Sequence, residues 1–238
     1  MKICVIPDIH GSSAWREVVN QEIQQVDRFV FLGDYFDSKD GLPNLQEEAD
    51  NFREIVHFAQ KYQAVDLLIG NHDLQYIGGA KCSGYQPELG PLVNNTLQEL
   101  VCSGQLKCTA QWGRYLFSHA GLSRVWMKLM RYDAVEVINR EFQANSLSLD
   151  FSPYAREMND YSGNSIYQGP LWIRPEALDE GHWEGIHQVV GHTPLDEISY
   201  LPAGEYRIIF CDTKLRQYLI IDTEREEENI CEVAVANR

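Results

Sequence analysis

Apolar positions in the first part of the chain follow two different patterns in turn. Mainly apolar runs at residues 2–7, 28–32 and 65–69 are typical of buried strands. Between these runs, residues 14–25 and 47–62 carry apolar side chains at helical spacing. Strands that alternate with helices indicate parallel pairing and a layered α/β core.

The rest of the chain has a less regular pattern. Residues 123–143 are expected to be helical, and residues 151–169, rich in Ser, Asn, Tyr and Gly, are expected to form a loop. Short apolar runs predict strands at 207–211, 218–222 and 231–235. We therefore expect an α/β protein with two sheets packed face to face as a β-sandwich, and with helices outside.

Length and charge narrow the possibilities. A chain of 238 residues can bury one sizeable core, which favours a single domain over residues 1–238. No apolar run is long enough to cross a bilayer, and the apolar start of the chain is too short for a secretory signal, so a cytoplasmic location is expected. The formal net charge of −15 disfavours nucleic acid and anionic membranes as partners. The cysteines show no CxxC spacing and are expected to be free thiols.

Each of the first three predicted strands ends in a cluster of polar residues and glycine. These clusters are Asp8-Ile9-His10-Gly11, Gly33-Asp34-Tyr35-Phe36-Asp37 and Gly70-Asn71-His72-Asp73. In open α/β sheets ligands bind at the carboxyl ends of strands, so the clusters should converge on one crevice. Two further histidines, His119 and His192, follow strand-like runs at 115–117 and 189–190.

Taken singly, these residues have ordinary explanations. Asp8 and His10 could simply form local hydrogen bonds, and His119 or His192 could be a core histidine. Five such clusters in order, each at a strand end, instead predict a metal site. Mixed carboxylate, amide and imidazole donors suit Mn²⁺, Fe or Zn²⁺. Cysteine ligation has no support, and Cys82 is interpreted as a structural thiol, with a place in the cleft as the alternative.

The order of these clusters resembles the signature of the calcineurin-like metallophosphoesterases, over the span from Asp8 to His192. The phosphoprotein (serine/threonine) phosphatase branch is the most similar, because it has Gly-Asp-Tyr-Val-Asp, His-Gly-Gly-Leu-Ser and Gly-His motifs. The corresponding segments here are Gly33-Asp34-Tyr35-Phe36-Asp37, His119-Ala120-Gly121-Leu122-Ser123 and Gly191-His192-Thr193-Pro194.

The resemblance implies an αββα fold and a site for two divalent ions, with manganese expected and iron or zinc as alternatives. One ion would be held by Asp8, His10 and Asp34. Asp34 would bridge to a second ion, held by Asn71, His119 and His192. A hydroxide bridging the ions would attack phosphorus. The family places His72 outside the metal shell as the general acid, and Asp37 would hydrogen-bond it and favour its charged form.

Two positions depart from the family pattern. Pro194 stands where many members have a second histidine, which leaves the first ion fewer protein ligands. Ser38 stands where the phosphatase branch has a phosphate-binding arginine. The segment Leu171-Trp172-Ile173-Arg174 resembles a Leu-Trp-x-Arg segment of some bacterial members. Arg174 is therefore the candidate phosphate clamp, with a surface ion pair as its alternative.

The expected function is hydrolysis of phosphate monoesters, on a phosphorylated protein or a small molecule. The alternative is hydrolysis of dinucleoside polyphosphates or other small phosphate esters and diesters at the same site. A scaffold without activity would be expected to have lost ligands, whereas all but the residue at the Pro194 position are present. Specificity is expected to come from the loops at residues 78–95 and 144–185.

Overall fold

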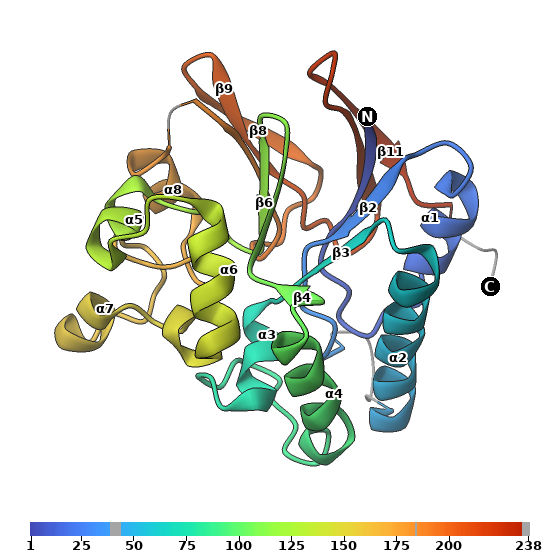
Figure 1. Ribbon diagram of the computed structural model, residues 1–238, viewed down its shortest axis with the longest axis horizontal. Coiled ribbons are helices and arrows are strands. Elements are labelled where there is room, and N and C mark those ends of the chain that lie inside the picture. The colour runs from blue at the N-terminus through green and yellow to red at the C-terminus, as the bar shows by residue number, and fades with distance from the viewer. Residues whose placement is uncertain (39–43, 184, 235–238) are drawn as a thin grey trace.

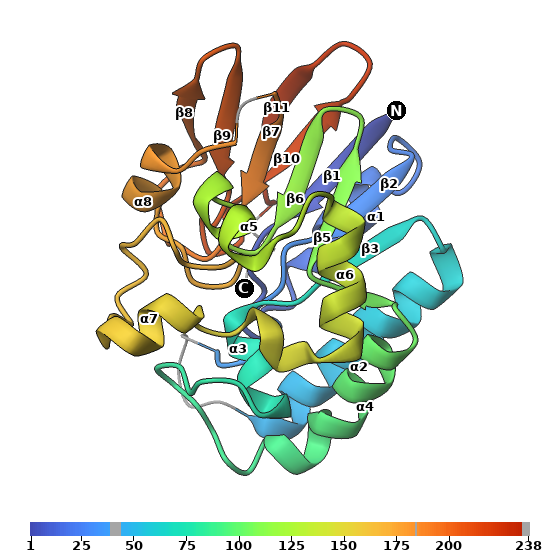
Figure 2. The same cartoon turned by 60° about the vertical axis from the view of Figure 1, so that its left-hand side comes forward.

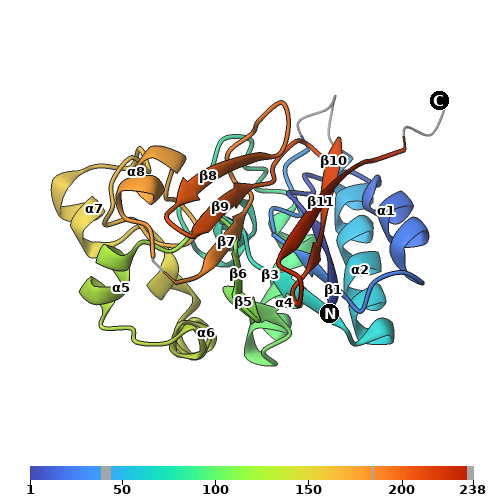
Figure 3. The ribbon, with the colours of Figure 1, turned by 90° about the horizontal axis from the view of Figure 1, so that it is seen from above.

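The computed structural model describes residues 1–38, 44–183 and 185–234. Within these residues the strands form two sheets, ordered β11-β10-β1-β2-β3-β4 and β5-β6-β7-β9-β8 (Figure 1). Seen from above, α1 and α2 lie outside the six-stranded sheet, and α5, α7 and α8 lie beyond the five-stranded sheet (Figure 3). The predicted α/β sandwich flanked by helices is confirmed.

The six-stranded sheet is built around three parallel strands that the sequence predicted. β1 pairs with β2, and β2 with β3, in parallel, while β10 and β11 extend the sheet in antiparallel fashion. The strand predicted at 231–235 is displaced, because the hairpin register pairs Gln217 with Glu232 and so starts the strand earlier; residue 235 lies outside the described residues. The strands are β1 (Lys2–Ile6), β2 (Arg28–Phe31), β3 (Val65–Leu68), β4 (Leu106–Lys107), β10 (Gln217–Asp222) and β11 (Glu227–Glu232).

The five-stranded sheet also has a parallel centre. β6, β7 and β9 pair in parallel, and β5 and β8 are antiparallel strands at the two edges. The prediction at 207–211 corresponds to β9, whereas β5 and β8 were not predicted. The bounds are β5 (Thr109–Trp112), β6 (Tyr115–Ser118), β7 (His187–Val190), β8 (Ser199–Ala203) and β9 (Tyr206–Phe210).

Alternation along the strands divides the core into layers. Ile3 and Val5 of β1 pack between the sheets against β6, β7 and β9, while Cys4 and Ile6 face α1 and α2. On the far side of the five-stranded sheet, Phe210 packs with the apolar side chains of α8. Successive strand residues point to opposite faces, so an uninterrupted apolar run serves both layers at once.

Two helical predictions need correction. The helix expected at 123–143 is two helices, α5 and α6, separated where Arg131 adopts a left-handed conformation with φ 58°. The loop expected at 151–169 contains the short helix α7, whose start Ser152 caps by accepting a hydrogen bond from Ala155 N. The helices are α1 (Trp15–Glu22), α2 (Leu45–Tyr62), α3 (Asn71–Leu74), α4 (Gly90–Cys102), α5 (Arg124–Met130), α6 (Val135–Ala144), α7 (Pro153–Met158) and α8 (Pro175–Glu180), with 3₁₀ turns at Gln75–Ile77 and Ser146–Leu149. None of the helices in the described part of the chain has the length and apolarity needed to span a membrane.

Candidate active site

The loops that follow the parallel strands of both sheets meet at one end of the sandwich, beside α3 (Figure 2). Backbone hydrogen bonds hold neighbouring loops together: His10 N donates to Asp34 O at 2.7 Å, and Gly191 N donates to His119 O at 2.8 Å. A further bond crosses between the sheets, from His192 N to Asp8 Oδ2 at 3.0 Å. The expectation that the strand-end clusters converge is therefore met.

Several of these side chains sit on unusual backbone. His10, Asp34, Asp37 and His192 have φ values of 43°, 50°, 63° and 67°, in the left-handed region that side chains rarely adopt. Such conformations cost free energy and persist where the surroundings enforce them, commonly at functional sites.

Two glycines allow the loops to approach closely. A Cβ added to Gly70 would lie 2.0 Å from Asp34 Oδ1, and one added to Gly191 would lie 1.9 Å from Asp8 Oδ1. Real atoms cannot approach so closely, so these carboxylates occupy space that only glycine leaves open.

Three donor atoms form the tightest part of the site. Asn71 Oδ1 lies 2.8 Å from His119 Nε2 and 3.0 Å from His192 Nδ1, and the two nitrogens are 3.2 Å apart. Adjacent ligands of an octahedral ion at about 2.1 Å are themselves about 3.0 Å apart. Asp34 Oδ1 adds a fourth donor, 3.5 Å from His119 Nε2. This set fits a divalent ion.

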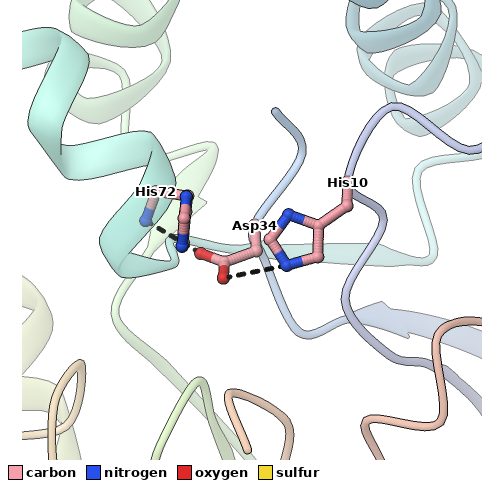
Figure 4. Close-up of side chains that lie close together, drawn as sticks. All are labelled: His10, Asp34 and His72. Carbon is pink, nitrogen blue, oxygen red and sulfur yellow. Dashed lines mark hydrogen bonds and ion pairs between the residues drawn. The ribbon is translucent and has the colours of Figure 1, made fainter. Parts of the chain in front are cut away.

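A second group lies on the other side of Asp34. Asp34 Oδ2 is 3.6 Å from His10 Nε2 (Figure 4). Donor atoms of Asp8, Asp34 and His119 also lie within 4.8 Å of one another. Asp34 thus stands between both groups, as expected for a bridging ligand. A ring nitrogen of His72 lies within 4.8 Å of donor atoms of His10 and Asp34, so His72 could itself reach an ion here.

Backbone carbonyls fix the orientation of two imidazoles. The Nδ1–H group of His10 donates to Phe36 O at 2.8 Å, and that of His119 donates to Leu32 O at 2.9 Å. A carbonyl can only accept, so in each ring the Nε2 lone pair is left to face the carboxylates. This is the outer-shell support that metal-binding histidines usually have.

The site gathers several buried carboxylates. Burial raises the pKa of Asp8, and the neighbouring Asp212 and Asp34 carboxylates raise it further. Burial opposes ionisation of Asp34, but the surrounding imidazoles, His119 foremost, lower its pKa overall. Across residues 1–38, 44–183 and 185–234, no Lys or Arg forms an ion pair with these three carboxylates. Buried charge of one sign needs compensation, which divalent ions would supply.

Burial also keeps two candidate ligands neutral. It lowers the pKa of His119 and lowers that of His192 still more, and the adjacent His119 adds to the latter shift. A neutral imidazole is the form that binds a metal. Asp212, by contrast, was not predicted. It follows β9 and is buried, so the strand predicted at 207–211 already carried the signal of a polar residue at its end.

A hydrogen-bond network surrounds His72. Its Nδ1 lies 2.6 Å from Asp37 Oδ2, so the predicted pairing of these two residues is present. Tyr76 OH and Gln75 Nε2 also donate to the Asp37 carboxylate. Asp37 N in turn donates to Glu48 Oε2 on α2 at 3.0 Å. No local pattern singles out Tyr76, Gln75 or Glu48, because their roles depend on contacts made only in the folded chain.

A cavity of about 740 Å³ opens beside the donor atoms. Arg174 lines it, at the start of α8, with its backbone N bonded to Gly163 O at 3.0 Å. The Arg174 Nη1 group donates to Thr193 Oγ1 at 3.2 Å. In the described part of the chain no carboxylate pairs with Arg174, so the geometry gives no support to the ion-pair alternative. Ser38 does not line the cavity, whereas Pro194 does.

Cys82 also lines this cavity. This position agrees with the alternative interpretation of Cys82, a place in the cleft, and not with a purely structural thiol. Its Sγ accepts a hydrogen bond from Asn71 Nδ2 at 3.1 Å, and its backbone N donates to Gln75 Oε1 at 2.8 Å. The first of these bonds turns the Asn71 carbonyl oxygen toward the histidines. Burial and the nearby Asp34 raise the pKa of the thiol to about 12, so it is protonated at neutral pH and unsuited to act as a nucleophile.

Carboxylate, amide and imidazole donors that two packed sheets bring together at one end form a candidate site for divalent metal ions. The chain belongs to the calcineurin-like phosphoesterases, whose family model matches residues 1–214. It is accordingly a phosphate ester hydrolase, of a family that uses a dinuclear metal site.

Solved structures share this fold. A cold-active protein-tyrosine phosphatase of a psychrophilic Shewanella species is 18% identical, with a TM-score of 0.64 over 98% of this chain and 80% of that chain. A metallophosphoesterase from Sphaerobacter thermophilus is 16% identical, with a TM-score of 0.55 over 99% of this chain and 89% of that chain. At these identities the likeness concerns the fold. No curated protein sequence matches the chain.

Proposed function

We propose that this chain hydrolyses phosphate monoesters at a site for two divalent metal ions. The observation that carries the proposal is the donor set of Asn71 Oδ1, His119 Nε2 and His192 Nδ1, mutually 2.8–3.2 Å apart, beside a cavity that Asn71, His192 and Arg174 line. Metal ions held beside a cationic side chain suit a substrate with several terminal oxygens.

The proposed metal ligands divide into two sets that share one carboxylate. Asp8, His10 and Asp34 would hold the first ion, and Asp34, Asn71, His119 and His192 the second. When bound, two such ions supply hydroxide at neutral pH and neutralise phosphoryl oxygens. Manganese is the ion we expect, with iron or zinc as alternatives, because the donors mix oxygen and imidazole nitrogen.

The other roles fall to residues around the cavity. His72 would give a proton to the leaving oxygen from Nε2, because its Nδ1 is bonded to Asp37. Arg174 would bind a non-bridging oxygen of the phosphate. A monoester offers three terminal oxygens to these partners, whereas a diester offers one fewer and carries less charge. The Shewanella phosphatase is named for phosphotyrosine, which is also a monoester.

Metal-stripped protein tests this function directly. We expect no hydrolysis without added ions, and recovery with Mn²⁺, on a panel of phosphopeptides, aryl and alkyl monoesters, a bis-aryl diester and a dinucleoside polyphosphate. Monoesters should have the highest kcat/KM. Faster hydrolysis of the diester or of the dinucleoside polyphosphate would contradict the monoesterase proposal and favour the alternative substrates.

Arg174→Ala should raise KM and lower kcat for a monoester, with a combined loss of about 10- to 100-fold in kcat/KM, the range expected for one hydrogen bond to a charged group. The loss for a diester should be clearly smaller. Arg174→Lys should recover part of the activity, since the charge returns without the planar fork. Arg140→Ala, which removes an exposed arginine of α6, is the matched control. Equal losses for both ester types would contradict the proposed role of Arg174 in recognising the phosphate of a monoester.

A further inference from the structure

One wall of the cavity is aromatic. Phe151, Tyr161 and Trp172, which together we call the aromatic wall, line the same cavity as His72 and Arg174. The rings of Phe151 and Trp172 are stacked, with centroids 4.1 Å apart and planes inclined by 18°. Tyr161 meets Phe151 edge to face at 4.8 Å and is half exposed. The proposed metal ligands, general acid and phosphate clamp do not include these rings.

The aromatic wall lies directly beside the candidate metal site. The Trp172 ring stands 6.3 Å from the His192 imidazole, with the planes nearly perpendicular. Trp172 also precedes Arg174 by only two residues, so one short segment provides both the phosphate clamp and part of the wall. A group bonded to a phosphate held at this site would therefore have these rings among its neighbours.

One carboxylate holds the Trp172 ring of the wall in place. Asp150 Oδ1 accepts a hydrogen bond from Trp172 Nε1 at 3.2 Å, and its Oδ2 accepts one from Ala80 N at 3.1 Å. Asp150 therefore fixes the indole and joins two segments that both line the cavity. Side chains ordered before binding lose little conformational entropy when a ligand arrives, so this surface is prepared for contact.

Packing alone does not account for these rings. Core aromatic residues of this chain, such as Phe29 and Phe52, are almost completely buried, whereas Tyr161 is 50% exposed and Phe151 and Trp172 are only partly covered. Partly exposed rings in a cavity that also contains polar catalytic groups are typical of ligand sites.

We propose that the aromatic wall binds the leaving group of an aryl phosphate monoester, such as a phosphotyrosyl side chain. A ring bonded directly to the ester oxygen lies next to the phosphate, as the wall lies next to His192. In a nucleoside monophosphate a ribose separates the base from the phosphate, which would carry the base past Trp172. This inference rests on the proposed function, because it assigns the substrate class of the same site.

The test compares one peptide carrying phosphotyrosine with the same peptide carrying phosphoserine. We expect the ratio of their kcat/KM values to fall about three- to tenfold in Tyr161→Leu and in Trp172→Leu, the range expected for loss of an aromatic contact. The aryl ester is intrinsically more reactive, but this difference affects wild type and variants equally. It therefore does not contribute to the change in the ratio between wild type and a variant. Tyr154→Leu is the matched control, because Tyr154 packs against Tyr167 in a tilted ring pair and does not line the cavity.

An unchanged ratio in both wall variants, with both peptides still hydrolysed, would overturn the inference and leave the proposed function intact. Higher activity on a nucleoside 5′-monophosphate, lost in the same variants, would also overturn it. A protein that hydrolyses no ester contradicts the proposed function instead. In that case calorimetry with benzylphosphonate and methylphosphonate still decides the inference, since the wall predicts tighter binding of the aromatic compound and loss of that preference in Tyr161→Leu.

Discussion

Asp34→Asn should abolish turnover, by at least ~10³-fold, and should reduce bound metal well below the two ions per chain expected for wild type. The carboxylate lies between the two donor groups, with Oδ2 3.6 Å from His10 Nε2 and Oδ1 3.5 Å from His119 Nε2. Asparagine keeps the shape but loses the charge and one of the two oxygens. Elemental analysis together with steady-state kinetics measures both effects.

The control is a carboxylate that is equally buried but remote from the cavity. Asp66 on β3 pairs with Arg28 and Lys107 at 3.0 and 2.7 Å. Asp66→Asn should lower the free energy of unfolding yet retain both ions. Two tightly held ions per chain in Asp34→Ala would rule out the bridging role. In wild type the first ion, with only three protein ligands, should leave first under mild chelation.

His72→Ala should lose ~10²–10⁴-fold in kcat, the usual contribution of general acid catalysis, while both ions stay bound. The loss should be smaller for nitrophenyl phosphate than for an alkyl phosphate, because a good leaving group needs little protonation. His57→Ala, an exposed histidine on α2, is the control and should leave kcat unchanged.

Metal analysis of His72→Ala also separates the two roles that the geometry allows this residue, since a ring nitrogen of His72 lies within 4.8 Å of donor atoms of His10 and Asp34. Loss of one ion from this variant would make His72 a ligand and not the acid. Equal losses for good and poor leaving groups would likewise contradict proton transfer. Asp37→Asn should reproduce part of the defect, because it removes the carboxylate that orients His72 through Nδ1, the nitrogen that does not serve as the acid. It should not release metal, because Asp37 is not one of the proposed ligands.

The parts of the fold predicted from the sequence are those with strong local patterns. β1, β2 and β3 are mainly apolar runs whose residues are largely buried on both faces, and α2 has a clear amphipathic period. The edge strands β5 and β8 were missed, because an edge strand is partly exposed and lacks such a run. α4 was also missed, although Gly90-Pro91 at its start is a typical helix beginning.

The candidate site divides in the same way. The strand-end motifs are local signals that marked five polar clusters, and the resemblance to the calcineurin-like family then singled out six candidate ligands in them, whose roles stay predictions: Asp8, His10, Asp34, Asn71, His119 and His192. Asp212 follows the strand predicted at 207–211, so its place at a strand end is a local signal, but its approach to the site depends on β9 lying beside β7, a strand order that the sequence does not reveal. Asp150 depends on contacts to Trp172 and Ala80, distant along the chain. Tertiary convergence of this kind has no local signature.

The donors at the candidate metal site come from both sheets, and hydrogen bonds cross there from His192 N to Asp8 and from His119 Nδ1 to Leu32 O. Polar contacts at the site therefore join the two sheets at one end of the sandwich, whereas apolar packing joins them elsewhere. Ions bound at the site would oppose local separation of the two sheets at that end. Metal binding and closure of that end would therefore be thermodynamically coupled: ions that bind only the closed form raise the free energy needed to open it, and opening would weaken metal binding in turn.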